Sequence, residues 1–151
     1  MKIKLYVVGK KNSSYQIFIN DYIKKINHSL DITFTLINPS GLSGKLARQK
    51  DSENIIQRLC DIDTLWLLDE TGSQLSSPEL AHIIENQNNK SKNLSIVIGG
   101  AYGVSDDLKK QADFIWSLSK LVLPHELAWV VVAEQLYRAT QINKNSNYHH
   151  A

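Results

Sequence analysis

Five short segments of this chain have the apolar pattern of β-strands. Residues 2–9 (KIKLYVVG) alternate and then become continuously apolar, and residues 31–38 (DITFTLIN) are rich in β-branched and apolar side chains. The short, continuous apolar runs at 64–68 and 95–98 are typical of strands that are buried on both faces of a parallel sheet. A fifth strand is predicted at 115–118.

Five other segments have the pattern of helices. Apolar residues at spacings of three and four predict an amphipathic helix over 12–26, and a more polar helix is expected over 45–60. Ser77-Pro78-Glu79 predicts a helix start with Ser77 as its cap, and Ser105-Asp106-Asp107 begins the next helix in the same manner. A last helix is predicted over 124–142, because its pattern persists for longer than a strand would.

Strands that alternate with helices predict a single three-layer α/β domain over residues 1–151, with a mostly parallel sheet. In this class, ligands bind beyond the carboxyl ends of the strands. The chemically informative positions are therefore the three strand exits at 69–72, 99–103 and 119–125.

The last predicted helix carries an unusual run, because residues 127–133 are apolar at seven successive positions. A helix that is apolar around nearly its whole circumference has to be covered on every side. In a chain this short, we expect a second copy to provide the cover. The sequence therefore predicts a homodimer through this helix.

Composition narrows the class of protein further. The chain has 151 residues, of which 42% are hydrophobic, as expected for one soluble domain. No apolar run approaches the roughly 18 residues of a membrane span, and the alternating N-terminus differs from a signal peptide, so we expect a cytoplasmic protein without a membrane partner. The single cysteine, Cys60, excludes an intramolecular disulfide and is expected to be a small buried side chain on a helix.

A near-neutral total charge of +2 hides an asymmetry along the chain. Residues 1–50 hold nine basic and two acidic residues, whereas residues 51–151 hold eight basic and thirteen acidic ones. A basic portion on a mildly acidic body suits a polyanion such as nucleic acid, because Lys and Arg that neutralise phosphates release counterions. The dispersed positions also suit an ordinary solvated helix face, so both interpretations stay open on composition alone.

Candidate chemistry gathers at the strand exits, and each motif has two interpretations. The glycines of Gly99-Gly100-Ala101-Tyr102-Gly103 suit either a tight turn or a loop that a cofactor approaches closely, and the motif is neither G-x-G-x-x-G nor a P-loop. Asp69 and Glu70 are a possible acid/base pair, but adjacent acids on a strand point in divergent directions, which favours solvated charge.

His125 and Glu126 match the first half of the zinc motif H-E-x-x-H. Trp129 stands where the second histidine ligand belongs, so we expect neither a metalloprotease nor a bound metal.

Several motifs in one order carry a resemblance to a known family. They are LLDETGSQLSS at 67–77, IGGAYGVS at 98–105, SLSK at 117–120, LPHEL at 123–127 and EQLYRA at 134–139. From the KIKLYVVGK start to the terminal Tyr148-His149, the chain resembles the RlmH-type methyltransferases of the SPOUT superfamily, which methylate N3 of a pseudouridine in 23S ribosomal RNA.

The resemblance implies a SPOUT fold, an α/β domain with a C-terminal trefoil knot, and S-adenosylmethionine as the methyl donor. Backbone groups between apolar side chains can recognise adenine, which suits the residue types at these positions. The cofactor contacts implied by position are Leu68, Gly100, Ser119, Lys120, Leu121, Val122, Leu123 and Pro124.

The resemblance also implies methyl transfer on ribosomal RNA, with the ribosome as a partner. His125 and the tail residues Tyr148 and His149 are the candidate catalytic groups, the tail reaching the site from the same or the other subunit. Trp129 departs from the family pattern His-x-Leu-x-Arg, so it is either a dimer-interface aromatic, with Lys120 or Arg138 compensating, or a sign of altered RNA docking. The competing class is a non-catalytic RNA-binding or ribosome-binding homologue.

Overall fold

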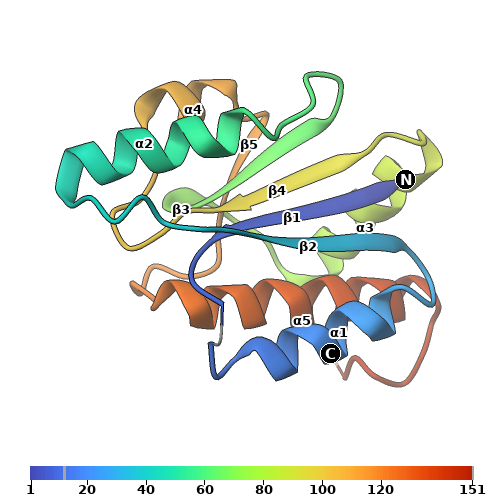
Figure 1. Ribbon diagram of the computed structural model, residues 1–151. Helices are drawn as coiled ribbons and strands as arrows, with labels where there is room; N and C mark the ends of the chain where they lie inside the picture. The colour runs from blue at the N-terminus through green and yellow to red at the C-terminus, as the bar shows by residue number, and fades with distance from the viewer. Residues whose placement is uncertain (12, 151) are drawn as a thin grey trace.

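The computed structural model describes residues 1–11 and 13–150. Five strands form one sheet in the order β2-β1-β4-β3-β5, with helices on both sides (Figure 1). The strands are β1 (Lys2–Val8), β2 (Asp31–Ile37), β3 (Thr64–Gln74), β4 (Leu94–Ile98) and β5 (Phe114–Ser117). The helices are α1 (Gln16–Ile26), α2 (Gly44–Ile56), α3 (Ser77–Asn89), α4 (Asp106–Gln111) and α5 (His125–Asn143). All four strand pairs are parallel, which confirms the α/β class.

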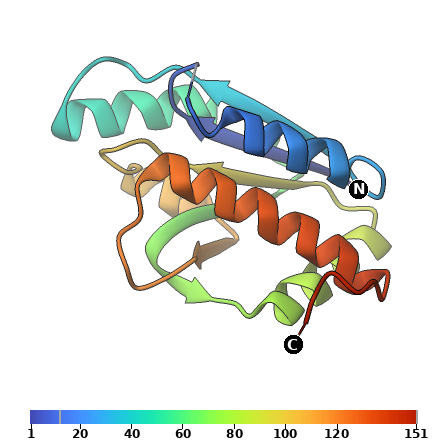
Figure 2. The same ribbon diagram turned by 90° about the horizontal axis from the view of Figure 1, so that it is seen from below.

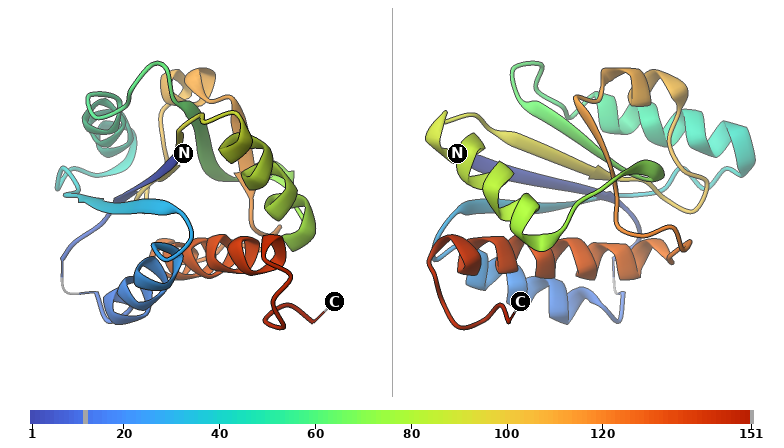
Figure 3. Two further views of the ribbon diagram at one scale, coloured as in Figure 1. Left: turned by 90° about the vertical axis from the view of Figure 1, so that its right-hand side faces the viewer. Right: turned by 180° about the vertical axis from the view of Figure 1, so that it is seen from behind.

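Each face of the sheet packs against its own set of helices. Helices α1, α3 and α5 cover one face, and α2 and α4 cover the other (Figures 1 and 3). The alternation of β1 shows the division, because Ile3, Leu5 and Val7 belong to the first cluster while Val8 belongs to the second. The double cover explains why the central strands are continuously apolar in sequence.

The register of the sheet aligns the carboxyl ends of its central strands. Val7 of β1 and Leu68 of β3 both lie opposite Ile98, the last residue of β4. On the far side of β3, Leu68 lies opposite Trp116 of β5. The loops that follow these strands therefore leave the sheet at one edge.

Strand β3 is longer than the predicted 64–68, because it continues to Gln74 after a register shift between Leu68 and Ser73. Gly72 lies at this irregularity, where a Cβ atom would overlap the backbone of Ile115. Only a glycine lets β3 and β5 approach so closely at this point. The pattern of apolar residues in the sequence gives no sign that β3 extends this far.

Helix α3 begins one residue earlier than expected. The cap is Ser76, whose Oγ accepts a hydrogen bond from Glu79 N at 3.2 Å, while the Glu79 carboxylate accepts one from Ser76 N at 2.7 Å. Ser77, the predicted cap, instead donates its hydroxyl to Gln135 of α5 at 2.6 Å. Two adjacent serines compete for the capping position, and the reciprocal capping box with Glu79 decides between them.

The ends of α1 and α2 also differ from the predicted bounds. Helix α1 begins at Gln16, and Asn12, the predicted start, lies outside the described residues. Helix α2 ends at Ile56, so Cys60 lies in the connection to β3 and is exposed. The prediction of a buried, helical Cys60 was wrong, because the chain turns at Arg58 toward the next strand before reaching it.

Helix α5 is covered largely by its own chain. It packs against α1, α3 and the sheet, which bury Ala128, Val132 and Ala133. Leu127 and Val131 are half-buried and belong to neither core cluster, so a narrow apolar stripe is left for any partner. Among the described residues no helix, α5 included, is long and apolar enough to cross a membrane.

Trp129 is a core residue of the monomer, with 0% of its surface exposed. Its ring centroid lies 6.1 Å from that of Phe34 and 5.6 Å from that of His125, and its far edge meets Gly9. The interpretation of Trp129 as a dimer-interface aromatic was therefore wrong. The indole occupies the space between α5 and the end of β1, where a Cβ on residue 9 would overlap it.

This contact predicts strong coupling between Gly9 and Trp129. Gly9→Ala should lower the free energy of unfolding by about 1–3 kcal/mol, since overpacking a rigid aromatic forces the backbone to shift. In a Trp129→Phe background, whose smaller ring leaves room for the methyl group, the same change should cost less than half as much. Urea unfolding of the four proteins measures both values, and equal costs in the two backgrounds would contradict the packing described.

Candidate functional site

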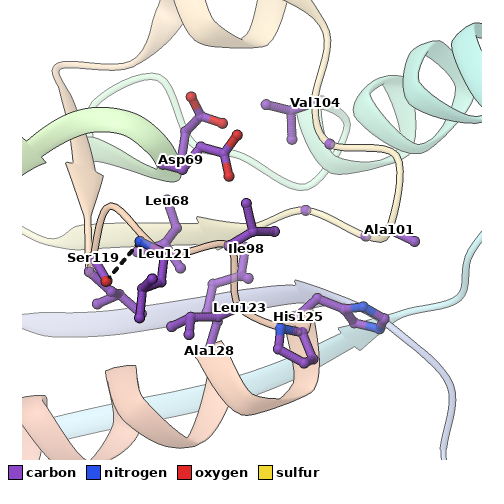
Figure 4. Close-up of a pocket in the computed structure, with 17 residues that line it drawn as sticks. Leu68, Asp69, Ile98, Ala101, Val104, Ser119, Leu121, Leu123, His125 and Ala128 are labelled. Atoms are coloured by element: carbon purple, nitrogen blue, oxygen red, sulfur yellow. Dashed lines mark hydrogen bonds between the residues drawn. The ribbon is translucent and has the colours of Figure 1, made fainter.

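A cavity of about 650 Å³ lies at the carboxyl edge of the sheet (Figure 4). Its walls come from the end of β3, the loop between β4 and α4, and the loop between β5 and α5 together with the first turn of α5. This volume lies within the roughly 300–1,000 Å³ of small-molecule sites in proteins. The aligned strand ends thus create one concave site from three segments that are distant in sequence.

Most of the residues that the family resemblance assigned to a cofactor line this cavity. The lining includes Leu68, Gly100, Ser119, Leu121, Val122, Leu123 and Pro124. Lys120 is exposed and is not among the lining residues. His125 also lines the cavity, at the start of α5. The structure therefore brings these residues together, while their roles stay predictions.

The glycine loop after β4 is a tight turn. Gly103 N donates to Gly100 O at 3.1 Å, and Gly103 has a φ of +77°, which strains any residue with a side chain. A Cβ on Gly100 would lie 3.1 Å from Cγ1 of buried Val8. The space beside Gly100 is thus occupied by the core, and a valine at position 100 would strain the fold rather than only block a ligand.

The loop between β5 and α5 is fixed at its start and open at its tip. The Ser119 hydroxyl accepts a hydrogen bond from Leu121 N at 3.0 Å, and Ser119 O accepts one from the Ser117 hydroxyl at 2.9 Å. Beyond this turn, Leu121 and Val122 line the cavity but are 73% and 78% exposed. Two large apolar side chains held at the mouth of a cavity are typical of a surface that a ligand covers.

Asp69 and Glu70 line the cavity too, and they provide its only acidic side chains. Asp69 lies 3.8 Å from Lys109 Nζ and accepts a hydrogen bond from the Thr71 hydroxyl. Both acids belong to β3 and not to a loop, but Glu70 is exposed, as expected of solvated charge, whereas Asp69 is half-buried beside Lys109. In Figure 4, Asp69 lies across the cavity from Ala128 and His125.

The tail residues Tyr148 and His149 lie elsewhere, beside the C-terminal half of α5 (Figure 2). The Tyr148 ring packs edge-on against Tyr137 at 4.8 Å, and its hydroxyl donates to Glu134 Oε1 at 3.1 Å. Arg138 joins them, because it donates to Glu134 at 2.6 Å and to His149 Nδ1 at 3.1 Å. The structure thus does not bring the tail to the cavity of its own chain.

This network favours the protonated form of the Tyr148 hydroxyl. Burial, followed by the hydrogen bond to Glu134, raises the pKa of Tyr148 well above its usual value. Tyr148 is then a neutral donor near pH 7. A guanidinium has only donors, so His149 Nδ1 is the acceptor in its contact with Arg138.

Sequence reasoning missed several lining residues, including Ile98, Val104 and Ala128. Ala128 had a usable signal, since it stands four residues after Pro124 and therefore on the same side of a helix. Val104 had none, because only the return of the loop toward α4 brings it to the cavity. Within residues 1–11 and 13–150, no three His, Cys, Asp or Glu side chains gather in a group that could hold a metal ion.

The carboxyl edge of a parallel sheet is where proteins of the α/β class bind small ligands, and this cavity lies there. Comparison with known proteins narrows this class to a family. The profile of a family described as "Predicted SPOUT methyltransferase" matches residues 1–149. Proteins named ribosomal RNA large subunit methyltransferase H are similar over nearly their full length. Those of Thiobacillus denitrificans and Flavobacterium psychrophilum are each 37% identical, with 99% of both chains covered. That of Dictyoglomus thermophilum is 33% identical, with 99% of this chain and 100% of the relative covered.

Two solved structures have a similar fold. A methylase family protein from Haemophilus influenzae superposes with a TM-score of 0.58 at 13% identity, covering 99% of this chain and 70% of its own. A methylase family protein from Neisseria gonorrhoeae gives a TM-score of 0.53 at 14% identity, covering 99% and 85%. The chain belongs to the SPOUT methyltransferase family.

The geometry of the cavity predicts that filling it removes ligand binding. Ala128→Leu adds three carbon atoms to a side chain that faces the cavity from the first turn of α5. The probe is S-adenosylhomocysteine, the demethylated form of the methyl donor that the sequence resemblance implies. We expect its affinity to fall by at least about tenfold, since that corresponds to roughly 1.4 kcal/mol of lost contacts. Calorimetry measures the affinity, and an unchanged thermal midpoint shows that the fold is intact. Full affinity in a folded variant would place the ligand elsewhere.

Proposed function

We propose that this protein transfers a methyl group from S-adenosylmethionine to N3 of a pseudouridine in the 23S ribosomal RNA of the large subunit, on the assembled ribosome. The observation that carries the proposal is similarity over 99% of the chain to proteins named ribosomal RNA large subunit methyltransferase H. The cavity at the sheet edge supports it, because such an enzyme has to hold a small methyl donor beside an open surface for RNA.

The cavity fits the proposed methyl donor. Backbone groups of Leu68, Gly100 and the segment 119–124 would hold the adenosine between apolar side chains, with Lys120 at the outer side of that segment. The close packing of Gly100 on Val8 keeps the loop backbone itself at the cavity wall. When bound, the donor supplies an electrophilic methyl group on a sulfonium sulfur.

The chain has two tasks in the proposed reaction. It aligns the N3 nitrogen with the methyl carbon, and it favours loss of the N3 proton. We propose His125 for the second task, because it lines the cavity and a ring nitrogen of a neutral imidazole can accept a proton. Because its pKa is raised, Tyr148 keeps its hydroxyl proton and is a poor proton acceptor. We propose that it donates a hydrogen bond that positions the target nucleotide.

The tail would serve the cavity of a second subunit. Arg138, which holds the tail, follows His125 by thirteen residues on α5, a separation of about 20 Å along the helix. Tyr148 and His149 packed on that end of the helix do not reach a nucleotide at the cavity of the same chain. A homodimer that places the tail of one subunit beside the cavity of the other resolves the separation.

The half-buried stripe of Leu127 and Val131 supports the homodimer. Both side chains lie on the outer side of α5, outside the two core clusters. Phe18 of α1, a helix that packs against α5, is a further large apolar side chain that is 56% exposed. We propose that a second copy covers these side chains.

The basic N-terminal portion supports the RNA substrate. Lys10 and Lys11 follow β1 at the same edge of the sheet as the cavity, and Lys45 and Arg48 lie on α2, where Arg48 Nε donates to Tyr102 O at 3.0 Å. Lys25 contributes less, because it pairs with Asp21 at 2.9 Å.

An enzyme that acts on assembled ribosomes works in the cytoplasm, which we include in the proposal.

We include the C-terminal trefoil knot of the family in the proposal as well. A knot would fix the loops at 98–104 and 118–125 against each other, as a preformed cavity requires.

The alternative class is a homologue that binds RNA or ribosomes without catalysis. It would share the basic surface and the dimer but would not need a lined cavity. Transfer of radioactive methyl from S-adenosylmethionine to ribosomes of a strain that lacks the modification separates the two classes. We expect label in 23S RNA at the pseudouridine, and binding without transfer would favour the alternative.

Deleting residues 147–151 should separate binding from catalysis. We expect S-adenosylhomocysteine affinity to stay nearly unchanged, while single-turnover methyl transfer falls by about 10²-fold or more, as loss of a positioning or proton-transfer group commonly causes. Deleting only residues 150 and 151 keeps Tyr148 and His149 and is the matched control. Transfer at the full rate after the longer deletion would exclude the tail from the site.

The same variants test which subunit the tail serves. A heterodimer of one tail-deleted subunit and one Ala128→Leu subunit has an intact cavity and an intact tail only on different chains. We expect this heterodimer to transfer methyl groups if each tail acts at the cavity of the partner subunit. An inactive heterodimer would mean that each tail acts at the cavity of its own chain.

The dimer itself is tested by light scattering at micromolar concentration, where we expect twice the mass of one chain. Val131→Asp should give a monomer, because a charge buried without a partner costs several kcal/mol. Ile62→Asp, at a side chain that is 79% exposed beyond the opposite edge of the sheet, is the control and should stay dimeric. A monomeric mass for the unaltered protein would contradict the proposal.

A further inference from the structure

The charged side chains in the cavity wall are acidic. Among its lining residues, the side chains that carry a full charge at neutral pH are Asp69 and Glu70, and no Lys or Arg faces them from the lining. Lys109 Nζ, 3.8 Å from Asp69, partly compensates that carboxylate. The Glu70 side chain is exposed, and its carboxylate has no ion pair or hydrogen bond among the described residues. The negative potential at this wall therefore comes mainly from Glu70.

The proposed reaction changes the charge of the molecule in the cavity. The bond between the methyl carbon and sulfur breaks, its electron pair stays on sulfur, and the methyl carbon bonds to N3, while the N3 proton passes to a base, for which His125 is proposed above. S-adenosylmethionine, a sulfonium, thereby becomes S-adenosylhomocysteine, a neutral thioether. Donor and product have almost the same shape and share the ammonium and carboxylate of the amino-acid portion, so most contacts distinguish them poorly. A carboxylate near the sulfur distinguishes them, because it attracts the sulfonium centre and not the thioether.

We propose that Glu70, assisted by Asp69, makes the cavity select the cationic donor over its neutral product. The inference rests on the proposed function, since it takes S-adenosylmethionine as the ligand. It assigns the two acids a role in specificity and product release, with no part in proton transfer. Asp69 has the smaller share, because Lys109 and the Thr71 hydroxyl already hold its carboxylate.

The size of the effect follows from the exposure of Glu70. A single charge pair at a hydrated surface is worth on the order of 1 kcal/mol, so loss of the Glu70 charge should reduce the preference for the donor by about three- to tenfold. The effect should shrink at high ionic strength, because salt screens exposed charges beyond about 10 Å at 0.1 M.

The test compares two affinities in each of four proteins. Calorimetry gives the dissociation constants of S-adenosylmethionine and S-adenosylhomocysteine for the unaltered protein, Glu70→Gln, Asp69→Asn and Glu85→Gln. Glu85 is an exposed glutamate of α3 that does not line the cavity, so it controls for total charge. We expect Glu70→Gln to weaken donor binding about three- to tenfold with little change for the product, Asp69→Asn to have a smaller effect, and Glu85→Gln to have none.

The readout is the ratio of the two dissociation constants, which a general loss of folding or of cavity shape does not change. An unaltered ratio in both Glu70→Gln and Asp69→Asn would overturn the inference while leaving the proposed function in place. An equal shift in Glu85→Gln would also overturn it, because the effect would then be that of total charge. Failure of the unaltered protein to bind either compound would overturn the proposed function together with this inference.

Discussion

The shared register of β1 and β3 on β4 is the constraint on which the rest of this structure depends. Parallel neighbours that end at the same level send their connections out at the same edge, so residues after position 68 and after position 98 meet although thirty residues separate them. The loop after β5 joins them, because β5 pairs with the end of β3. The cavity is a consequence of this pairing, and both faces of the sheet have to be covered for the pairing to persist.

Helix α5 connects the cavity, the core and the C-terminal tail. Its first turn borders the cavity through His125 and Ala128, its middle packs Trp129 against Gly9, and its last turns hold the tail through Glu134 and Arg138. A rigid helix of this length separates the two ends by a fixed distance. The distance between the cavity and the tail, and the half-buried stripe of Leu127 and Val131, are the two observations behind the proposed homodimer.

Much of the fold could be predicted from the sequence, because the period of apolar residues is a local property. The five strands and five helices were found, and the errors lie where tertiary contacts compete with local signals. Ser76 rather than Ser77 caps α3, since Ser77 bonds to α5. Cys60 is exposed because the chain leaves α2 to enter β3.

The sequence by itself determined the α/β class, the strand exits as the place of the site, and, through ordered motifs, the family. Tertiary structure alone decided which side chains face the cavity. Asp69 and Glu70 line it because β3 continues past its apolar run, Gly100 packs closely on buried Val8, and Trp129 is a core residue because Gly9 makes room for it. The physical reason is that periodicity records whether a residue is buried, while the identity of its neighbours depends on strand order and register, which no local pattern contains.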